Sequence, residues 1–291
     1  MVPPDSQPPE QVRRTSHSPY DPRSLDDELL QSALDAAGDR AWGPVVVVPS
    51  TGSTNADAAD QVDQGCPEGF AVVADEQTQG RGRLGRAWVS PYGAGLAMSV
   101  VLRPHVPEAS WGWIPLMTGL AVVEALGLQG LEARLKWPND VVVDGPARDG
   151  GPGPRKLGGL LAEVSGSAVV MGAGINVDLA EDEAPVARAT SARIEGADVQ
   201  RERLVVDVLA GLRRRYVDWQ LCGGDADRAG LRDEYRAACL TLGREVRVHL
   251  PGGSVLEAAA VDVDPTGRLV VRTPDGTAHD LSAGDVEHLF S

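Results

Sequence analysis

"GRGRLGR" at residues 80–86 is the stretch on which the choice of fold depends. Its glycines, Gly80, Gly82 and Gly85, have the G-x-G-x-x-G spacing of a dinucleotide-binding loop. That fold requires a strand before the glycines and a helix after them, so that pyrophosphate lies at the helix N-terminus. An apolar strand pattern precedes the loop, but the proline and glycines of the following "AWVSPYGAG" prevent a helix. The sequence therefore argues against a dinucleotide-binding fold.

Three arginines, Arg81, Arg83 and Arg86, lie between and after these glycines. A guanidinium binds phosphate or carboxylate through paired hydrogen bonds, and glycine lets the backbone come close to a ligand. The loop is typical of an anion-binding segment, although a flexible surface loop with solvated arginines explains these seven residues equally well. Binding of nucleic acid is less favoured, because no second basic cluster with interleaved aromatic residues accompanies the loop.

The composition indicates a soluble cytoplasmic protein. The chain has 291 residues, of which 42% are hydrophobic, and a net charge of −15, which argues against non-specific binding to nucleic acid or anionic lipid. Three scattered cysteines without C-x-x-C spacing predict neither a disulfide framework nor a zinc site. No apolar run approaches the roughly 20 residues that span a bilayer, and the N-terminus lacks the apolar segment of a signal peptide.

The sequence pattern divides the chain into three parts. Residues 1–22 are rich in proline and charge, lack apolar periodicity, and are expected to form a disordered tail. Residues 23–240 mix helical and strand patterns and predict an α+β domain with a mixed sheet. Residues 241–291 contain four short strand patterns separated by "PGG", "DPTG" and "PDG" turns, which are typical of a small β-barrel.

Helical and strand patterns place the motifs on elements. Strands are expected at 45–50, 69–75, 95–104, 131–137, 140–145, 156–164 and 168–177. Helices are expected at 24–38, 53–65, 113–127 and 201–221, with a last piece ending near Ala238. In the first helix Ser24 is the expected N-cap and Gly38 the stop, and one face holds Leu25, Leu29, Leu30, Ala33 and Leu34.

Two further stretches carry lysine and aspartate. "KWPND" (136–140) places Lys136 and Asp140 around a Trp-Pro step, and its Asn-Asp step can turn the chain, so a simple hairpin turn is the commoner explanation. "RKLGGLLAE" (155–163) places Lys156 at the start of an apolar strand, with two glycines that allow a ligand close to the backbone. An exposed strand-end lysine is the alternative. Taken alone, each stretch is more simply explained by a structural role, but the occurrence of both in one chain favours a functional site.

Together with "GSTNAD" (52–57) and "MGAGINVD" (171–178), these stretches occur in an order that resembles biotin protein ligases, which make biotinyl-adenylate and transfer biotin to a carrier-protein lysine. The resemblance covers residues 45–291. It implies a class II aminoacyl-tRNA synthetase-like catalytic domain followed by an SH3-like β-barrel. It also implies ATP and biotin as substrates, Mg²⁺, and the biotin carboxyl carrier domain of biotin-dependent carboxylases as protein partner, with no DNA or membrane partner.

The resemblance also assigns residues to sites. The implied biotin site consists of Ser53, Thr54, Asn55, Gln77, Arg81, Gly82, Arg83 and Lys156. Hydroxyls and amides suit the ureido ring of biotin, which has one carbonyl acceptor and two N–H donors. The implied nucleotide site consists of Arg83, Arg86, Trp88, Asn139 and Asn176. Trp88 is expected to stack on adenine, with a loop-anchoring aromatic as the alternative, and Asn176 has a structural turn-end role as its alternative.

The implied catalytic residues are Arg83, Lys156 and Asp140. In the first step the biotin carboxylate attacks the α-phosphate of ATP, and the loop arginines, Lys156 and Mg²⁺ neutralise the negative charge. In the second step a carrier lysine attacks the mixed anhydride, and Asp140 accepts its proton or orients the amine. No residue is assigned as a metal ligand. Arg155 replaces the glycine of the family, so the preceding "DGGPGPR" turn is expected to be longer and looser than a tight hairpin.

Three alternatives remain at this point. A lipoate or octanoate ligase shares the catalytic fold, although the Ser-Thr-Asn and arginine stretches favour biotin. A biotin-sensing repressor requires an N-terminal winged helix, and residues 1–44, with one tail and one helix, are not expected to form that domain. A non-catalytic binding module is disfavoured, because the arginine set and the lysine–aspartate set are both intact.

Overall fold

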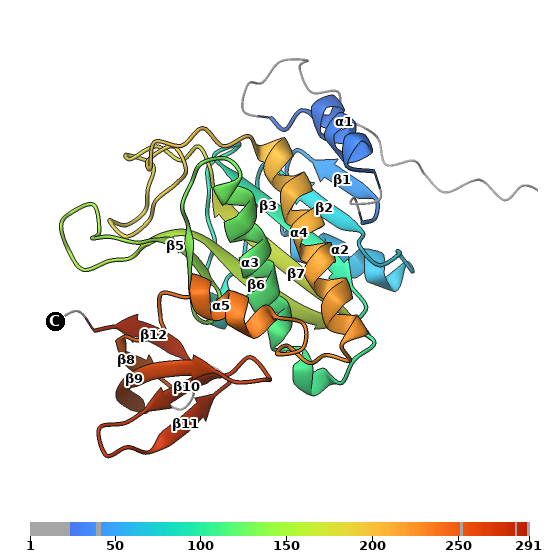
Figure 1. Cartoon of the computed structure of the whole chain (residues 1–291). Coiled ribbons are helices and arrows are strands. Elements are labelled where there is room, and N and C mark those ends of the chain that lie inside the picture. Colours follow the sequence, from blue (N-terminus) through green and yellow to red (C-terminus); the bar gives the residue numbers. More distant parts are fainter. Residues whose placement is uncertain (1–23, 39–41, 251–252, 283, 290–291) are drawn as a thin grey trace, which may run out of the picture.

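A seven-stranded mixed sheet forms the centre of the N-terminal part of the molecule (Figure 1). The computed structural model describes residues 24–38, 42–250, 253–282 and 284–289, so the tail expected over residues 1–22 lies outside the described residues. The strands are β1 (Val45–Val48), β2 (Ala71–Ala74), β3 (Gly95–Leu102), β4 (Arg134–Lys136), β5 (Asp140–Val143), β6 (Arg155–Ser165) and β7 (Ala168–Asn176). Their order is β1-β2-β3-β7-β6-β5-β4, and β1 and β2 are parallel while the other neighbours are antiparallel. The predicted mixed α+β sheet is confirmed.

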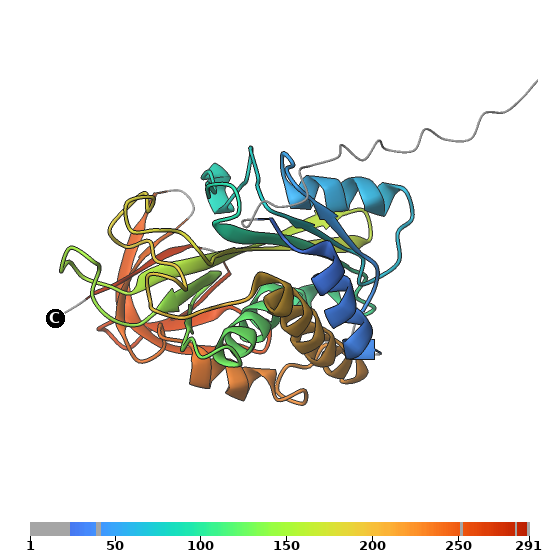
Figure 2. The ribbon, with the colours of Figure 1, turned by 90° about the horizontal axis from the view of Figure 1, so that it is seen from above.

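Helices cover both faces of this sheet, as Figure 2 shows. They are α1 (Asp27–Ala37), α2 (Thr54–Asp63), α3 (Trp113–Gly127), α4 (Arg201–Leu221) and α5 (Leu231–Ala238). On one face α3 contacts β4 to β7, and α4 packs on α3. On the other face α2 contacts β2, β3 and β7, and only part of that face is covered.

The apolar character of α3 is that of a core helix. By length and composition alone, the described stretch Glu108–Gly127 could cross a membrane, so the expectation that no run approaches this length was wrong. However, 61% of the most apolar 18-residue part of this stretch is buried inside the protein. Trp113, Ile114 and Met117 have no exposed surface. A helix that packs against the sheet on one side and against α4 and α5 on the others is apolar all round.

The first helix begins later than predicted. Its N-cap is Asp26, whose carboxylate accepts the backbone N–H of Leu29 at 2.9 Å, and not Ser24. Leu25, just before this N-cap, is tied to the residue after β2, because its backbone N–H donates to the Asp75 carboxylate at 2.8 Å. Gly38 ends the helix at φ +55°, as predicted, but Leu29 is 49% exposed and does not belong to the buried face.

A second, fully antiparallel sheet follows at the C-terminal end. Its strands are β8 (Glu245–His249), β9 (Val255–Val263), β10 (Leu269–Arg272), β11 (Ala278–Leu281) and β12 (Asp285–His288), in the order β11-β10-β9-β8-β12. The described residues thus form five strands here, and not the four that the sequence predicted. The last predicted strand divides because its two halves pair at opposite edges of the sheet, β11 with β10 and β12 with β8.

Candidate active site

A cavity of about 730 Å³ lies on the α2 side of the large sheet, where this sheet faces β12. Its lining comes from the start of α2, the loop after β2, the β4–β5 turn, β6, β7 and the segment before α4. The structure brings all the site residues named from the sequence to this one cavity: Ser53, Thr54, Asn55, Gln77, Arg81, Gly82, Arg83, Arg86, Trp88, Asn139, Asp140, Lys156 and Asn176. Stretches that are up to about 120 residues apart in the chain therefore form one site.

One end of the cavity is a buried hydrogen-bond network at the N-terminus of α2. The backbone N–H of Thr54 donates to Gln77 Oε1 at 2.9 Å, and Asn55 Nδ2 donates to Glu163 Oε2 at 2.6 Å. Ser53, Thr54 and Asn55 are only 7%, 3% and 6% exposed. We call this group, with Gln77, the polar end of the cavity. The side chains of Thr54, Asn55 and Gln77 are held in place by hydrogen bonds to other protein groups.

Ser99 lies behind the polar end and was missed by the sequence reasoning. Its Oγ is hydrogen-bonded to Asn55 Oδ1 at 2.6 Å and to Thr54 Oγ1 at 2.7 Å, and its side chain is fully buried. It is the only polar side chain in the otherwise apolar strand Gly95–Leu102, a signal that the sequence offered. A buried hydroxyl within an apolar strand requires a partner, so Ser99 fixes both side chains.

Two glycines of β7 form the floor of the cavity. A Cβ on Gly172 would lie 2.2 Å from Asn55 Oδ1, and a Cβ on Gly174 would lie 2.7 Å from Trp88 Nε1. Both residues stand on the same face of the strand, since they are two positions apart. The "GAG" of "MGAGINVD" therefore allows Asn55 and Trp88 to lie directly on the sheet. Lys156 Nζ is 5.6 Å from the centre of the Trp88 ring.

The glycine–arginine loop begins beside Gln77 of the polar end and lines the cavity toward the β4–β5 turn. The loop is a small hairpin in which the Gly82 N–H donates to Arg86 O at 2.7 Å and the Trp88 N–H donates to Gly80 O at 2.8 Å. In place of the long helix of a dinucleotide fold, the single 3₁₀ turn Arg83–Gly85 follows, with Leu84 at φ +58°.

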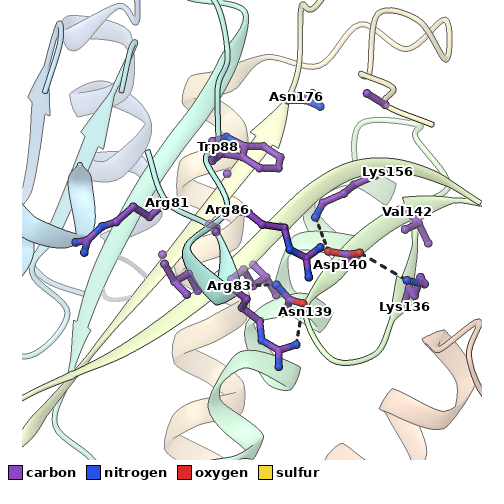
Figure 3. A pocket seen from close by; sticks show the side chains of 18 of the residues that line it. Arg81, Arg83, Arg86, Trp88, Lys136, Asn139, Asp140, Val142, Lys156 and Asn176 are labelled. Atoms are coloured by element: carbon purple, nitrogen blue, oxygen red, sulfur yellow. Dashed lines mark hydrogen bonds and ion pairs between the residues drawn. The ribbon is translucent and has the colours of Figure 1, made fainter. Parts of the chain in front are cut away.

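The three arginines of this loop point in different directions (Figure 3). Arg81 extends toward α2, and its guanidinium is 3.8 Å from Glu163. Arg83 points down toward α3 and its Nη1 donates to Asn139 Oδ1 at 3.4 Å, whereas Arg86 points toward Asp140. The loop therefore presents separate cations to different parts of the cavity, and not one arginine cluster.

Asp140 stands between two lysines (Figure 3). Its Oδ1 is 2.6 Å from Lys156 Nζ, and its Oδ2 is 3.9 Å from Lys136 Nζ. The neighbouring Asn139 donates from Nδ2 to Leu160 O at 2.9 Å, which ties the β4–β5 turn to β6. "KWPND" therefore forms the β4–β5 hairpin turn, as its structural interpretation predicted, and it also lines one side of the cavity. We call Arg83, Arg86, Lys136, Lys156 and Asp140 the charged end.

The turn before Lys156 is longer than a tight hairpin but is not loose, which corrects the expectation. The Arg155 guanidinium binds Glu195 through Nε at 2.7 Å and Nη2 at 2.8 Å, and donates from Nη1 to Pro146 O at 2.8 Å. Arg148 in the same turn donates to the carbonyls of Glu181, Val186 and Ala189. These contacts join the turn to the segment that follows β7.

The C-terminal sheet supplies one wall of the cavity through Val286, Glu287 and His288 of β12. Thr241 connects this wall to the β4–β5 turn, because it accepts the Trp137 N–H at 3.1 Å and lies 3.2 Å from His288 Nε2. Burial and the nearby Lys136 lower the pKa of His288 to about 4, so the imidazole is neutral at physiological pH. Sequence reasoning, which treated the two parts separately, did not find this wall.

Comparisons with known proteins agree with this architecture. Residues 47–179 match the biotin/lipoate A/B protein ligase family, and residues 241–289 match the biotin protein ligase C-terminal domain. The chain is 38% identical over 277 residues to the biotin–[acetyl-CoA-carboxylase] ligase of Mycobacterium tuberculosis, covering 93% of this chain and 96% of the relative. It is 30% identical over 246 residues to the bifunctional ligase/repressor BirA of Bacillus spizizenii, covering 81% and 71%. Among solved structures, the biotin protein ligase of Aquifex aeolicus in complex with biotin and ATP superposes with a TM-score of 0.68 at 28% identity, over 86% of this chain and 100% of that one.

Proposed function

Because this chain belongs to the biotin/lipoate A/B protein ligase family, we propose that it is an ATP-dependent biotin protein ligase. It converts biotin and ATP to biotinyl-5′-AMP and pyrophosphate, and then transfers biotin to a lysine of a biotin carboxyl carrier domain. The observation that carries the proposal is that a single cavity joins a buried polar end to a charged end. A small amphipathic acid that must be activated at its carboxylate requires both.

The polar end binds the ureido ring of biotin. One carbonyl acceptor and two N–H donors are matched by the hydroxyls and amides of Ser53, Thr54, Asn55 and Gln77. Ser99 and Glu163 hold Asn55, so the ligand meets groups that are already oriented. Pre-oriented polar groups in a mostly apolar pocket give both affinity and selectivity.

The charged end serves the transfer of the adenylyl group. The carboxylate of biotin attacks the α-phosphorus of ATP and pyrophosphate leaves, so two anions must be brought together. Lys156, Arg83 and Arg86 supply counter-charges around this point, and Lys156 exchanges its contact with Asp140 for the ligand. Trp88 and Asn176 are proposed to contact the nucleotide, Trp88 through the ring face that is not packed on Gly174.

Mg²⁺ is proposed to enter with ATP. The described residues contain no group of three or more His, Cys, Asp or Glu side chains placed to hold a metal. Mg²⁺ commonly binds through substrate phosphates and only one or two carboxylates, and Asp140 is an inward-facing carboxylate of the cavity. The ion supplies additional neutralisation of phosphate charge.

Asp140 is proposed to act in the second step. Once Lys156 turns to the acyl-adenylate, the Asp140 carboxylate is available to the amine of the carrier lysine, which it orients or deprotonates. Residues 23–240 then form the catalytic domain, and residues 241–291 close one side of its cavity. Since ATP and carrier domains are cytoplasmic, we place the enzyme there.

Mass spectrometry of a purified carrier domain tests this function. The domain is incubated with the protein, ATP, Mg²⁺ and, in separate reactions, biotin, lipoate or octanoate. We expect a single biotin adduct and no lipoyl or octanoyl adduct. Lipoylation or octanoylation in place of biotinylation would assign the chain to the other branch of its family. We also expect no gel shift with the DNA upstream of its own coding sequence.

A further inference from the structure

Thr190 connects two cavity residues that come from different strands. Its backbone N–H donates to the carbonyl of Lys156 at 2.9 Å, and its own carbonyl accepts from Asn176 Nδ2 at 2.9 Å. The Lys156 N–H donates in turn to Arg188 O at 2.6 Å, so residues 188–190 run beside the start of β6 as a short parallel bridge. Thr190 is fully buried, and no sequence pattern indicated this role.

This bridge supports Lys156 where the sheet supports it poorly. The pairing of β5 with β6 shifts register between Val141 and Val142, whose partners are Gly158 and Lys156. Such a β-bulge interrupts the ladder and changes the direction of nearby side chains. On the side of Lys156 that does not pair with β5, its backbone is therefore held by the segment before α4.

The segment before α4 is itself anchored by an ion pair. The Thr190 hydroxyl donates to Glu195 Oε1 at 2.6 Å, and the same carboxylate receives both hydrogen bonds from Arg155. The Arg155 and Glu195 side chains are only 17% and 13% exposed. Although burial opposes its charge, the hydrogen bonds from Arg155 and Thr190 lower the pKa of Glu195, so it is ionised at neutral pH.

We propose that Arg155, Thr190 and Glu195 are positioning residues that fix Lys156 in the cavity. Arg155 directly precedes Lys156, and consecutive side chains of a strand point to opposite faces, so a guanidinium fixed on one face sets the lysine on the other. The resemblance to biotin protein ligases implies glycine at the position of Arg155, so it does not itself predict this anchor. The proposal rests on the proposed function, because it assigns Lys156 to adenylate formation.

The test is single-turnover formation of biotinyl-adenylate by the full chain. Thr190→Val, which exchanges a hydroxyl for a methyl, and Glu195→Gln, which removes a charge, should each lower the rate constant about tenfold, since a small misplacement of a catalytic group has effects of this order. Thr190→Ser retains the hydroxyl and should stay close to the wild-type rate. Arg193→Ala is the matched control, because it breaks an exposed ion pair with Asp178 in the same segment and should change nothing.

Combination with Lys156→Ala separates positioning from a general loss of structure. If the anchor acts through Lys156, then Thr190→Val and Glu195→Gln should cause no further loss in the Lys156→Ala background. Equal losses in both backgrounds would overturn the proposal, as would a Thr190→Ser rate as low as that of Thr190→Val. If Glu195→Gln does not fold, the two Thr190 variants decide the outcome.

Hydrogen–deuterium exchange gives a readout that does not depend on catalysis. The amides of Lys156 and Thr190 should exchange faster in Thr190→Val and Glu195→Gln than in wild type or Arg193→Ala. Unchanged protection at both amides would overturn the anchor. A wild-type protein that forms no adenylate from biotin would refute the proposed function, while the exchange data would still show whether the anchor holds Lys156.

Discussion

The two ends of the cavity are built in opposite ways. At the polar end, Thr54 and Asn55 are almost fully buried and hydrogen-bonded to Ser99. At the charged end, the Lys156 and Asp140 side chains are 39% and 21% exposed, and Arg83 and Arg86 come from a loop that is largely open to solvent. The polar end is already hydrogen-bonded before a ligand arrives, whereas the charged end carries charges whose proposed partners arrive with ATP.

The difference follows from the chemistry of the two proposed ligands. A neutral ureido ring gains little from charge, and its recognition depends on donors and acceptors that are already oriented. Phosphates bring several negative charges, which exposed arginines and lysines attract without a fixed hydrogen-bond network. Substitutions at the polar end should therefore change biotin binding, and substitutions at the charged end should change the rates of the chemical steps.

Lys156→Ala should have the largest effect. Lys156 is the cation that the anchor fixes beside Asp140, and removal of one pre-oriented charge from a reacting phosphate costs about 10²–10³-fold in rate. Pyrophosphate release measured with saturating biotin and ATP checks this. Release at the wild-type rate would remove Lys156 from the first step.

Arg83→Ala should lower adenylate formation by about 10²-fold. The affinity for biotin in the absence of ATP should stay nearly unchanged, since Arg83 contacts Asn139 and lies away from the polar end. Calorimetric titration of biotin and a pyrophosphate assay give the two numbers. A variant that loses biotin affinity to the same extent as rate would contradict the division of the cavity. Arg203→Ala is the matched control, because the Arg203 side chain is 63% exposed on α4 and pairs with Asp207.

Asp140→Asn separates the two steps at the charged end. Adenylate formation should be close to normal, and transfer to the carrier lysine should slow by about 10²-fold, the usual contribution of a general base. Single-turnover measurements of the two steps, with pre-formed adenylate for the second, test the assignment. Equal losses in both steps would count against it.

Ser99→Ala should weaken biotin binding about tenfold and leave the rate at saturating biotin unchanged. It removes the hydroxyl that donates to Asn55 Oδ1 and one of the two partners of Thr54 Oγ1, and a buried group left unpaired costs about 1–3 kcal/mol. Thr118→Val is the matched control, because it removes a buried hydroxyl that bonds Ile114 O in α3, outside the cavity. Equal biotin affinity in the two variants would show that the Ser99 network does not orient the polar end.

The smallest effect concerns His288, in the wall that the C-terminal sheet supplies. The pKa of His288 is about 4 in the folded protein and about 6.5 in an unfolded chain, so the unfolded state binds the proton first as the pH falls. This contribution to stability is complete above pH 6.5 and is lost between pH 6.5 and 4, by an amount on the order of 3 kcal/mol. Chemical unfolding of wild type and His288→Asn across this range measures it. Parallel pH profiles for the two proteins would contradict the account.

The sequence predicted the elements and the site residues because each rests on a local signal. Periodicity marked the helices and strands, and the short motifs marked every cavity residue that was named, including Lys156. The mixed sheet and the five-stranded sheet followed largely from the order of these patterns, and only the last strand was wrongly left undivided.

The missed features depend on contacts between distant parts of the chain. Ser99 acquires its role only when α2 packs against β3, and Thr190 only when its segment lies along β6. Arg155 was interpreted as a source of looseness, because Glu195, its partner 40 residues later, carries no local signal. The side-chain directions were not predicted either, since the spacing of the arginines in the sequence does not show that Arg83 and Arg86 point to different places.

Biotin-dependent exchange of pyrophosphate into ATP by the full chain is the most direct test of the central claim. It requires the polar end to select the acid and the charged end to activate it in one cavity. We predict exchange that depends on biotin, is not supported by lipoate or octanoate, and falls by about 10²-fold or more in Lys156→Ala. Exchange that proceeds without biotin, or equally well with lipoate, would contradict the account.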